Sequence, residues 1–356
     1  MSSDANADFT GVDETPDHLK FDEDALTAYL QTHVDGFAGP LTVKKFKGGQ
    51  SNPTYLLTTP EQQYVLRRKP PGKLLPSAHA VDREYRVMTA LHAVGYPAPR
   101  TYILCEDDNI IGTAFFVMDF VPGRIFWDAS LPNVDRADRK ALFDALTDTI
   151  ADLHKIDYQA IGLEDYGKSG NYFERQIGRW SKQYKAAESD TIAEMDKLID
   201  WLPTAIPQDE AISIVHGDYR FDNVIMHDTE PRAIAVLDWE LSTLGHPLAD
   251  FTNYLMTWHF PPSVRGGLAG LDLDDLGIPD VDATVARYCA RTGRDGVPDL
   301  EFCLSYNMFR LCSIAQGVYA RAMQGNASSP KAIELGAQVK PLAMLAWSYA
   351  QKAGAD

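Results

Sequence analysis

Residues 212–250 read ISIVHGDYRFDNVIMHDTEPRAIAVLDWELSTLGHPLAD, and this stretch decides the fold. Apolar runs flank both the polar cluster HGDYRFDN and the later cluster DWE. Short apolar runs bounded by polar and turn-forming residues are typical of buried strands. Each polar cluster is therefore predicted to lie at the end of a strand or in the turn that follows it.

The spacing of these polar residues fits a site for phosphoryl transfer. Such a site needs one carboxylate to orient the attacking hydroxyl and take its proton, and metal ligands to hold the triphosphate. Asp218 and Asn223 are separated by four residues, as are the aspartate and asparagine of the kinase loop HRDxxxxN. Asp238, on the next predicted strand, would supply a further carboxylate. Mg²⁺ needs only one or two carboxylates beside phosphate oxygens and water, so we interpret Asp218 as the base and Asn223 and Asp238 as metal ligands.

Each of these residues also has a structural interpretation. Asp218, which follows a glycine, could form a turn, Asn223 could be a side-chain cap, and Asp238 could be a helix N-cap. Their combination, in this order and at this spacing, favours the chemical interpretation. We expect His216 to brace the loop through hydrogen bonds and not to act as a base.

The first third of the chain is predicted to form short strands around one helix. Strand-like runs occupy residues 41–47, 54–59, 62–69 and 114–121, and residues 81–94 have helical spacing. Beyond Pro122-Gly123 most of the chain has helical periodicity, apart from a strand-rich patch at residues 212–237.

These patterns predict an α+β, bilobal chain. We expect a loose acidic tail at residues 1–20, which lacks the basic-then-apolar pattern of a signal peptide. Residues 21–121 would form a small antiparallel-sheet lobe with one key helix, which binds the nucleotide. Residues 122–356 would form a larger, mainly helical lobe for catalysis and acceptor binding.

Three parts of the small lobe are candidates for nucleotide binding. The segment KFKGGQSNPTYLL places Gly48, Gly49, Ser51 and Asn52 where a loop over the phosphates is expected, although a plain hairpin turn explains the two glycines nearly as well. In the run AFFVMDFVPGR, main-chain groups of residues 119–121, from Asp119 to Val121, could pair with an adenine ring, with Met118 packed behind it. A buried edge strand would have the same pattern.

The third candidate is an ion pair. Period-two alternation puts Arg67 on the same strand face as Val65, and Glu84 flanks the apolar stripe of the predicted helix at residues 81–94. A shielded carboxylate needs a cationic partner, and we predict that this partner is Arg67. The alternative is a glutamate at the boundary that reaches solvent.

HGDYRFDN, followed by VLDWE and then HPLADF, resembles the aminoglycoside phosphotransferase and choline kinase family, whose fold is that of protein kinases. The resemblance implies that Asp218 is the catalytic base, that Asn223 and Asp238 hold Mg²⁺, and that ATP is the donor. The family usually has a lysine where Arg67 falls; an arginine can still grip phosphate oxygens with its planar fork. YVLRRKPPG and then REYRVM are most similar to a branch fused to acyl-CoA dehydrogenases, which implies a hydroxyacyl acceptor, free or on coenzyme A.

The amino-acid composition limits the kinds of partner that the chain is expected to bind. The 356 residues carry a net charge of −17, which disfavours nucleic acid and anionic membranes. The longest apolar run is too short to span a membrane, and the four cysteines have neither CxxC nor zinc-finger spacing, so we expect reduced core thiols in a cytoplasmic protein. Arg310 and Arg321 are expected on the surface, although in a cleft they would suit an anionic acceptor.

The sequence therefore predicts an ATP- and Mg²⁺-dependent kinase of a small-molecule hydroxyl, either an aminoglycoside or a hydroxyacyl compound. A catalytically weak nucleotide-binding pseudokinase is the alternative, favoured only by Arg67 in the place of a lysine. A metal-dependent hydrolase fits poorly, because no histidine ligands accompany the single asparagine. The oligomeric state is left open.

Overall fold

The computed structural model describes residues 11–47, 52–72, 79–323 and 332–356. The predicted phosphate-loop residues Gly48, Gly49 and Ser51 lie outside these ranges. The chain divides into two compact units. Unit 1 comprises Met1–Trp127, Ala160–Leu163 and Asn223–Ser242, and unit 2 comprises Asp128–Gln159, Glu164–Asp222 and Thr243–Asp356.

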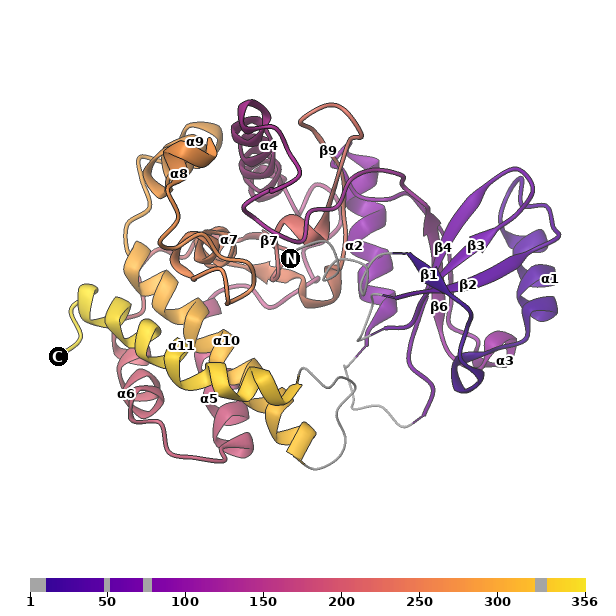
Figure 1. Ribbon diagram of the computed structural model, residues 1–356. Helices are drawn as coiled ribbons and strands as arrows, with labels where there is room; N and C mark the ends of the chain where they lie inside the picture. The colour runs from indigo at the N-terminus through magenta and orange to yellow at the C-terminus, as the bar shows by residue number, and fades with distance from the viewer. Residues whose placement is uncertain (1–10, 48–51, 73–78, 324–331) are drawn as a thin grey trace. The chain divides into compact units, whose positions relative to one another are not determined.

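Unit 1 is built on an antiparallel sheet of six strands in the order β1-β2-β3-β4-β6-β5. The strands are β1 Val12–Asp13, β2 Thr42–Phe46, β3 Thr54–Thr58, β4 Gln63–Arg68, β5 Thr101–Cys105 and β6 Phe115–Asp119 (Figure 1). Strands β2, β3, β4 and β6 fall within the four runs that the alternation of apolar residues predicts.

Helices lie against both faces of this sheet (Figure 1). On one face α1 (Glu23–His33) and the short α3 (Asp108–Ile111) form an apolar core with the sheet. That core includes Leu26, Leu30, Tyr55, Leu57, Leu66 and Phe115. On the other face α2 (Val81–Ala93) packs against β5 and β6. Because successive strand residues point to opposite faces, Leu66 enters the α1 core while Arg67 points toward α2.

Part of the expected N-terminal tail is structured. Val12 and Asp13 pair with Phe46 and Lys45 as the edge of the sheet. A 3₁₀ turn, η1, follows at Asp17–Leu19, and the Tyr55 hydroxyl donates to the Leu19 carbonyl over 2.9 Å. Residues 12–19 therefore lie against the sheet and are not loose.

Unit 1 also contains the hairpin of β8 (Val224–Met226) and β9 (Ala233–Val236). Arg124, which follows β6, exchanges two main-chain hydrogen bonds of 2.8 Å with Met226, and the Val236 N–H donates to the Pro97 carbonyl. The hairpin is thereby hydrogen-bonded to the segment before β5 and to the segment after β6.

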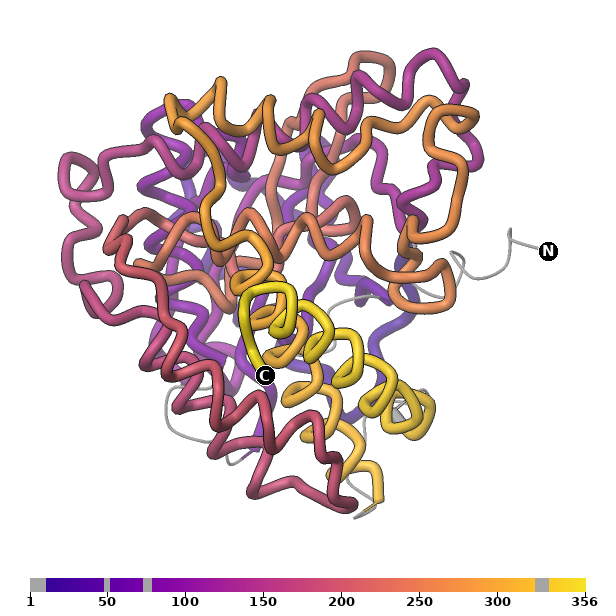
Figure 2. Tube along the Cα trace, turned by 90° about the vertical axis from the view of Figure 1, so that its left-hand side faces the viewer, coloured from indigo at the N-terminus to yellow at the C-terminus, as the bar shows by residue number. Residues whose placement is uncertain are grey.

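Unit 2 is mainly helical. Its helices are α4 Arg136–Lys155, α5 Tyr172–Ala187, α6 Ala193–Trp201, α7 Pro247–His259, α8 Leu273–Leu276, α9 Val281–Thr292, α10 Leu300–Met323 and α11 Ala332–Lys352. Strands β7 (Ser213–Val215) and β10 (Thr243–Gly245) form a small antiparallel pair among them. Helix α10 is buried along most of its length, and it packs against α5, α7 and α11; Figure 2 shows α11, in yellow, running beside it.

The expectation of core thiols is confirmed. All four cysteines are buried and unpaired. No helix in the described part of the chain has the length and apolarity needed to cross a membrane.

Candidate active site

The HGD turn follows β7, and one buried carboxylate holds it. The main-chain N–H groups of His216 and Gly217 donate to the two oxygens of Asp250 over 2.7 and 2.8 Å. Gly217 has φ +87°, a conformation that residues with a Cβ seldom adopt. The N–H of Asp218 donates to Nδ1 of His216 over 3.2 Å, which confirms that His216 braces the loop.

Asp250 lies in the first turn of α7 and was not singled out from the sequence, although it belongs to the HPLADF motif. Burial raises the pKa of its carboxyl group, but hydrogen bonds from the His154 side chain and from the His216 backbone outweigh burial and lower it. An ionised, buried acceptor of this kind fixes the backbone of the HGD turn, because each N–H would otherwise be left unpaired.

Asp218 is surrounded by arginines of unit 2. Nη2 of Arg265 lies 3.0 Å from its Oδ1, and Nε of Arg220 lies 3.6 Å from its Oδ2. Burial opposes ionisation, but Arg265, Arg220 and Arg310 hold the pKa of Asp218 well below its ordinary value. The side chain is 27% exposed, so a solvent-borne molecule can reach an ionised carboxylate there.

The expectation that Arg310 lies on the surface is wrong. Arg310 is 9% exposed and its Nη2 donates to the carbonyl of Gly217 over 2.6 Å. Arg310 stabilises the HGD turn from α10, because a charged donor to a carbonyl makes one of the stronger hydrogen bonds. Arg321, which lies further along α10, is exposed as expected.

In unit 1, Arg67 forms the predicted ion pair with Glu84. Its Nε lies 2.8 Å from Oε2 of Glu84, and the two side chains are 10% and 2% exposed. The same guanidinium also reaches Asp238 Oδ1 at 2.7 Å and Glu240 Oε2 at 3.4 Å through Nη2. Burial lowers the pKa of Arg67, but these three carboxylates outweigh burial and raise it. One guanidinium therefore holds three acidic side chains together.

Asn52 lies in the same cluster. It is fully buried, its Nδ2 donates to Oε1 of Glu84 over 2.9 Å, and its Oδ1 lies 2.9 Å from Nδ1 of His79. Asn52 thus fixes the end of the predicted phosphate loop to helix α2 through the carboxylate that Arg67 also binds.

Asn223 and Asp238 come together at one end of the β8–β9 hairpin. Val224 is paired with Val236, and beyond that pair the N–H of Leu237 donates to the Asn223 carbonyl over 2.8 Å. Asp238, the next residue, has φ +65°, a left-handed conformation that aspartate tolerates better than most residues. Such a conformation at a residue with a Cβ often marks a functional site.

The charge of this cluster fits a divalent cation. Three carboxylates face one guanidinium, and Asp238 and Glu240 are 36% and 24% exposed. Within the described ranges no group of three or more His, Cys, Asp or Glu side chains is arranged to enclose a metal ion. The residues fit a Mg²⁺ ion bound by one or two protein groups and otherwise by phosphate oxygens and water.

At the end of β6, the main-chain N–H of Asp119, which is predicted to pair with adenine, has a partner within the protein. The N–H of Asp119 donates to the Arg100 carbonyl over 2.8 Å, and its carboxylate accepts a hydrogen bond from the Tyr102 hydroxyl. Met118 is buried as expected, and Val121 is half-buried. The adenine contact of this segment stays a prediction.

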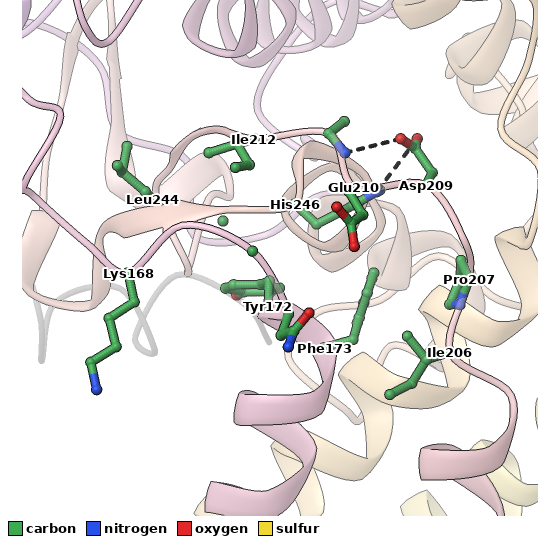
Figure 3. Close-up of a pocket in the computed structure, with 14 residues that line it drawn as sticks. Lys168, Tyr172, Phe173, Ile206, Pro207, Asp209, Glu210, Ile212, Leu244 and His246 are labelled. Atoms are coloured by element: carbon green, nitrogen blue, oxygen red, sulfur yellow. Dashed lines mark hydrogen bonds and ion pairs between the residues drawn. The ribbon is translucent and has the colours of Figure 1, made fainter.

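A small pocket lies in unit 2 beside the N-terminus of α7 (Figure 3). Lys168, Tyr172, Phe173, Asp209 and His246 are among the residues that line it. Its free volume is about 60 Å³, which holds a few water molecules at roughly 15 Å³ each.

Comparison with known proteins decides the family. The model of the phosphotransferase enzyme family matches residues 42–288. The chain belongs to this family. Among curated relatives, acyl-CoA dehydrogenase family member 11 of Homo sapiens is 42% identical over 334 residues, which are 92% of this chain and 43% of that protein. Member 10 of Mus musculus is 42% identical over 338 residues, 93% of this chain and 31% of that protein. The phosphotransferase chain thus spans less than half the length of these relatives.

Solved structures show the same fold. A protein of Ralstonia eutropha JMP134, provisionally assigned as an aminoglycoside phosphotransferase, is 52% identical, with a TM-score of 0.86 over 94% of this chain and 99% of that one. Choline kinase from Cryptosporidium parvum Iowa II is 12% identical, with a TM-score of 0.62 over 93% and 95% of the two chains. Spectinomycin phosphotransferase in complex with ADP and spectinomycin is 12% identical, with a TM-score of 0.61 over 93% and 99%. The predicted α+β, protein-kinase-like fold is confirmed, and the chain is a phosphotransferase of this type.

Proposed function

We propose that this phosphotransferase transfers the γ-phosphoryl group of ATP, in the presence of Mg²⁺, to a hydroxyl group of a small molecule. The observation that carries the proposal is the state of Asp218. Its carboxylate stands on a turn that Asp250 and Arg310 fix, it is held ionised, and it remains partly exposed. Phosphoryl transfer depends mostly on positioning and on electrostatic stabilisation, and a rigid, ionised carboxylate supplies the positioning.

In this proposal Asp218 accepts a hydrogen bond from the acceptor hydroxyl and then its proton. The acceptor oxygen forms a bond to the γ-phosphorus, the bond from that phosphorus to the β,γ-bridging oxygen breaks, and ADP leaves with the electron pair. The depressed pKa makes Asp218 a weak base. A weak base is adequate because the transition state is loose and the acceptor hydroxyl loses its proton late in the reaction.

The nucleotide would be held by unit 1, the proposed nucleotide-binding lobe. Gly48, Gly49, Ser51 and Asn52 would cover the phosphates, Arg67 and Glu84 would position them, and the segment from Asp119 to Val121 would contact adenine. Asn223 and Asp238 would hold Mg²⁺, which when bound neutralises negative charge on the triphosphate. Support comes from the buried Arg67–Glu84 pair and the shared position of Asn223 and Asp238.

Two acceptor classes follow from the relatives. The names of the curated relatives include acyl-CoA dehydrogenase, which supports a hydroxyacyl acceptor. Structural neighbours that act on antibiotics, such as spectinomycin phosphotransferase, support an aminoglycoside. We place the protein in the cytoplasm, where ATP and reduced thiols are both expected.

A regulatory nucleotide-binding protein without turnover is the second candidate function. The observation that favours it is that Arg67, which replaces the usual lysine, binds Asp238 directly at 2.7 Å. In a protein of this kind the metal ligand would stay engaged by arginine and would not coordinate Mg²⁺.

The deciding experiment measures ADP release from MgATP against a panel of aminoglycosides, choline-like alcohols, hydroxy acids and hydroxyacyl-CoAs. We expect acceptor-dependent ADP release by the wild-type chain, and loss of that release in Asp218→Asn. Nucleotide binding without release for any acceptor class would favour the regulatory protein instead.

A further inference from the structure

Arg265 lies in a tightly hydrogen-bonded loop after α7. The N–H of Val264 donates to the Pro261 carbonyl over 2.8 Å, and that of Ala269 donates to the Phe260 carbonyl over 2.8 Å. At Gly267 a Cβ atom would lie 2.0 Å from the Phe260 carbonyl oxygen, so only glycine fits. The sequence signal for this loop was the Arg-Gly-Gly run at residues 265–267.

The backbone of Arg265 is itself unusual. Its φ is +53°, in the left-handed region that a long side chain with a Cβ seldom adopts. The loop therefore imposes an unfavourable conformation on the residue that delivers a guanidinium to Asp218. Strain of this kind is kept where the surrounding structure over-determines it, and it is frequent at functional sites.

Arginine side chains gather around Asp218. Arg220, Arg265 and Arg310 all act on this carboxylate, and the second acid in the group, Asp222, is bound by Nη2 of Arg220. Two guanidinium groups, of Arg220 and Arg265, thus lie beside Asp218 and a third acts on it from α10, in a chain with a net charge of −17.

Part of this positive charge is available to a ligand. Nε of Arg220 is buried and makes no hydrogen bond to the described residues; its nearest acidic atom, Oδ2 of Asp218, is 3.6 Å away. The side chains of Arg220 and Arg265 are 32% and 27% exposed. A small anion can therefore approach both side chains from solvent.

We propose that Arg265, assisted by Arg220, is the residue that selects the acceptor, and that it takes acceptors with a carboxylate or a phosphate close to the hydroxyl. The inference rests on the proposed function and narrows its acceptor. When the acceptor binds, Nη2 of Arg265 releases Oδ1 of Asp218 and donates to the anionic group of the acceptor. Oδ1 of Asp218 then accepts a hydrogen bond from the acceptor hydroxyl. Arginine suits this exchange because its fork binds carboxylate and phosphate with two parallel hydrogen bonds.

The exchange has two consequences. Asp218 becomes more basic when Arg265 leaves it, so the base is strengthened only when the right acceptor is present. Cationic aminoglycosides and choline are disfavoured, because like charges brought together cost binding free energy.

The test is calorimetric titration of the full-length chain in the presence of MgADP, which needs no turnover. The anionic probes are 3-hydroxybutyrate and glycerol 3-phosphate, the neutral ones 1,3-butanediol and glycerol, and the cationic ones choline and kanamycin. The variants are Arg265→Ala, Arg265→Lys and Arg265→Gly; the last relieves the left-handed strain, so a loss of binding there has no backbone cause. Arg291→Ala is the matched control, because Arg291 is a half-exposed arginine paired with Asp152 on other helices of unit 2.

We expect one of the anionic probes to bind the wild-type chain, and which one binds distinguishes carboxylate from phosphate. Removal of a charge-assisted contact should weaken that binding about tenfold or more in Arg265→Ala and Arg265→Gly, less in Arg265→Lys, and not in Arg291→Ala. Equal affinity for anionic and neutral probes, preference for a cationic probe, no binding of either anion, or unchanged binding in the Arg265 variants would each overturn the proposal. Anion binding that depends on Arg265 in a chain without phosphoryl transfer would instead refute the proposed function alone.

Discussion

Nε of Arg67 lies 2.8 Å from Oε2 of Glu84, and Nη2 of the same side chain lies 2.7 Å from Oδ1 of Asp238. One guanidinium thus joins helix α2 to the proposed metal ligand through two different nitrogen atoms. An ammonium group is a single point charge and cannot reproduce this geometry. Arg67 is therefore suited to binding two acids at once.

Arg67 and Glu84 are predicted to act as a unit toward ATP. Arg67→Ala and Glu84→Ala should each raise the apparent KM for ATP, and the double variant should be little worse than either single variant, because each change already breaks the pair. Steady-state kinetics of the wild type, the two single variants and the double variant measures these KM values. The exposed pair Lys44–Glu14 serves as a control, for which alanine variants should leave the KM unchanged; strictly additive losses at Arg67 and Glu84 would show that the two residues are not coupled.

Asp218→Asn is predicted to lower kcat by about 10²- to 10⁴-fold, the usual contribution of a general base. Calorimetry should show nearly unchanged ATP affinity, and the variant should still unfold cooperatively, at a lower melting temperature because Arg265 and Arg220 lose their ionised partner. Asp228→Asn, at an exposed position in the β8–β9 turn, is the control for loss of one negative charge. Near wild-type turnover in Asp218→Asn would remove Asp218 from the role of base.

Asp238→Asn and Asn223→Ala are predicted to weaken MgATP binding, the first more strongly because it removes a charge from the proposed metal site. Asparagine is chosen at position 238 because it tolerates the left-handed backbone there (φ +65°). Titration with ATP should be repeated with EDTA present, where wild type and variants should bind alike. A variant at position 238 whose affinity for MgATP equals that of the wild type would rule out the metal role.

Several features of the site could be predicted because they depend on local pattern. Strand alternation placed Arg67 on the face of Val65, and helical spacing placed Glu84 on the sheet-facing side of α2; together these predict the ion pair that the structure contains. The loop length between Asp218 and Asn223, and the strand that precedes Asp238, are likewise short-range features. Periodicity carries this information because neighbouring residues are placed by backbone geometry alone.

Contacts between distant segments could not be predicted in this way. Asp250 supports the HGD turn from 33 residues downstream, Arg310 supports it from 93 residues downstream, and Arg265 reaches Asp218 from 47 residues downstream. Helical spacing also leaves open which face of α10 is buried, since that helix is apolar on most sides. The arginines around Asp218 could therefore be identified only from the folded structure.

The last prediction concerns acid stability and His246. Burial lowers the pKa of His246 from 6.5 to about 4, although Asp209 opposes the shift. Its Nδ1 accepts the N–H of Leu248 as the N-cap of α7 over 3.2 Å, which requires the neutral ring. Between pH 6.5 and about 4 the unfolded chain thus binds a proton that the folded chain does not, and the free energy of unfolding falls as the pH is lowered through this window. A shift of this size corresponds to about 3 kcal/mol.

His246→Asn should remove this part of the pH dependence, because asparagine is a good N-cap and does not titrate. Urea unfolding at pH 7.5, 6, 5 and 4 measures it, and the informative quantity is the change in unfolding free energy with pH, since the variant also loses ring packing against Phe173. His18→Asn, at an exposed position, should keep the wild-type slope. His259, whose pKa burial also lowers to about 4, is present in all three chains and cancels in the comparison. An equal loss of stability with falling pH in wild type and His246→Asn would mean that the cap survives protonation of the ring.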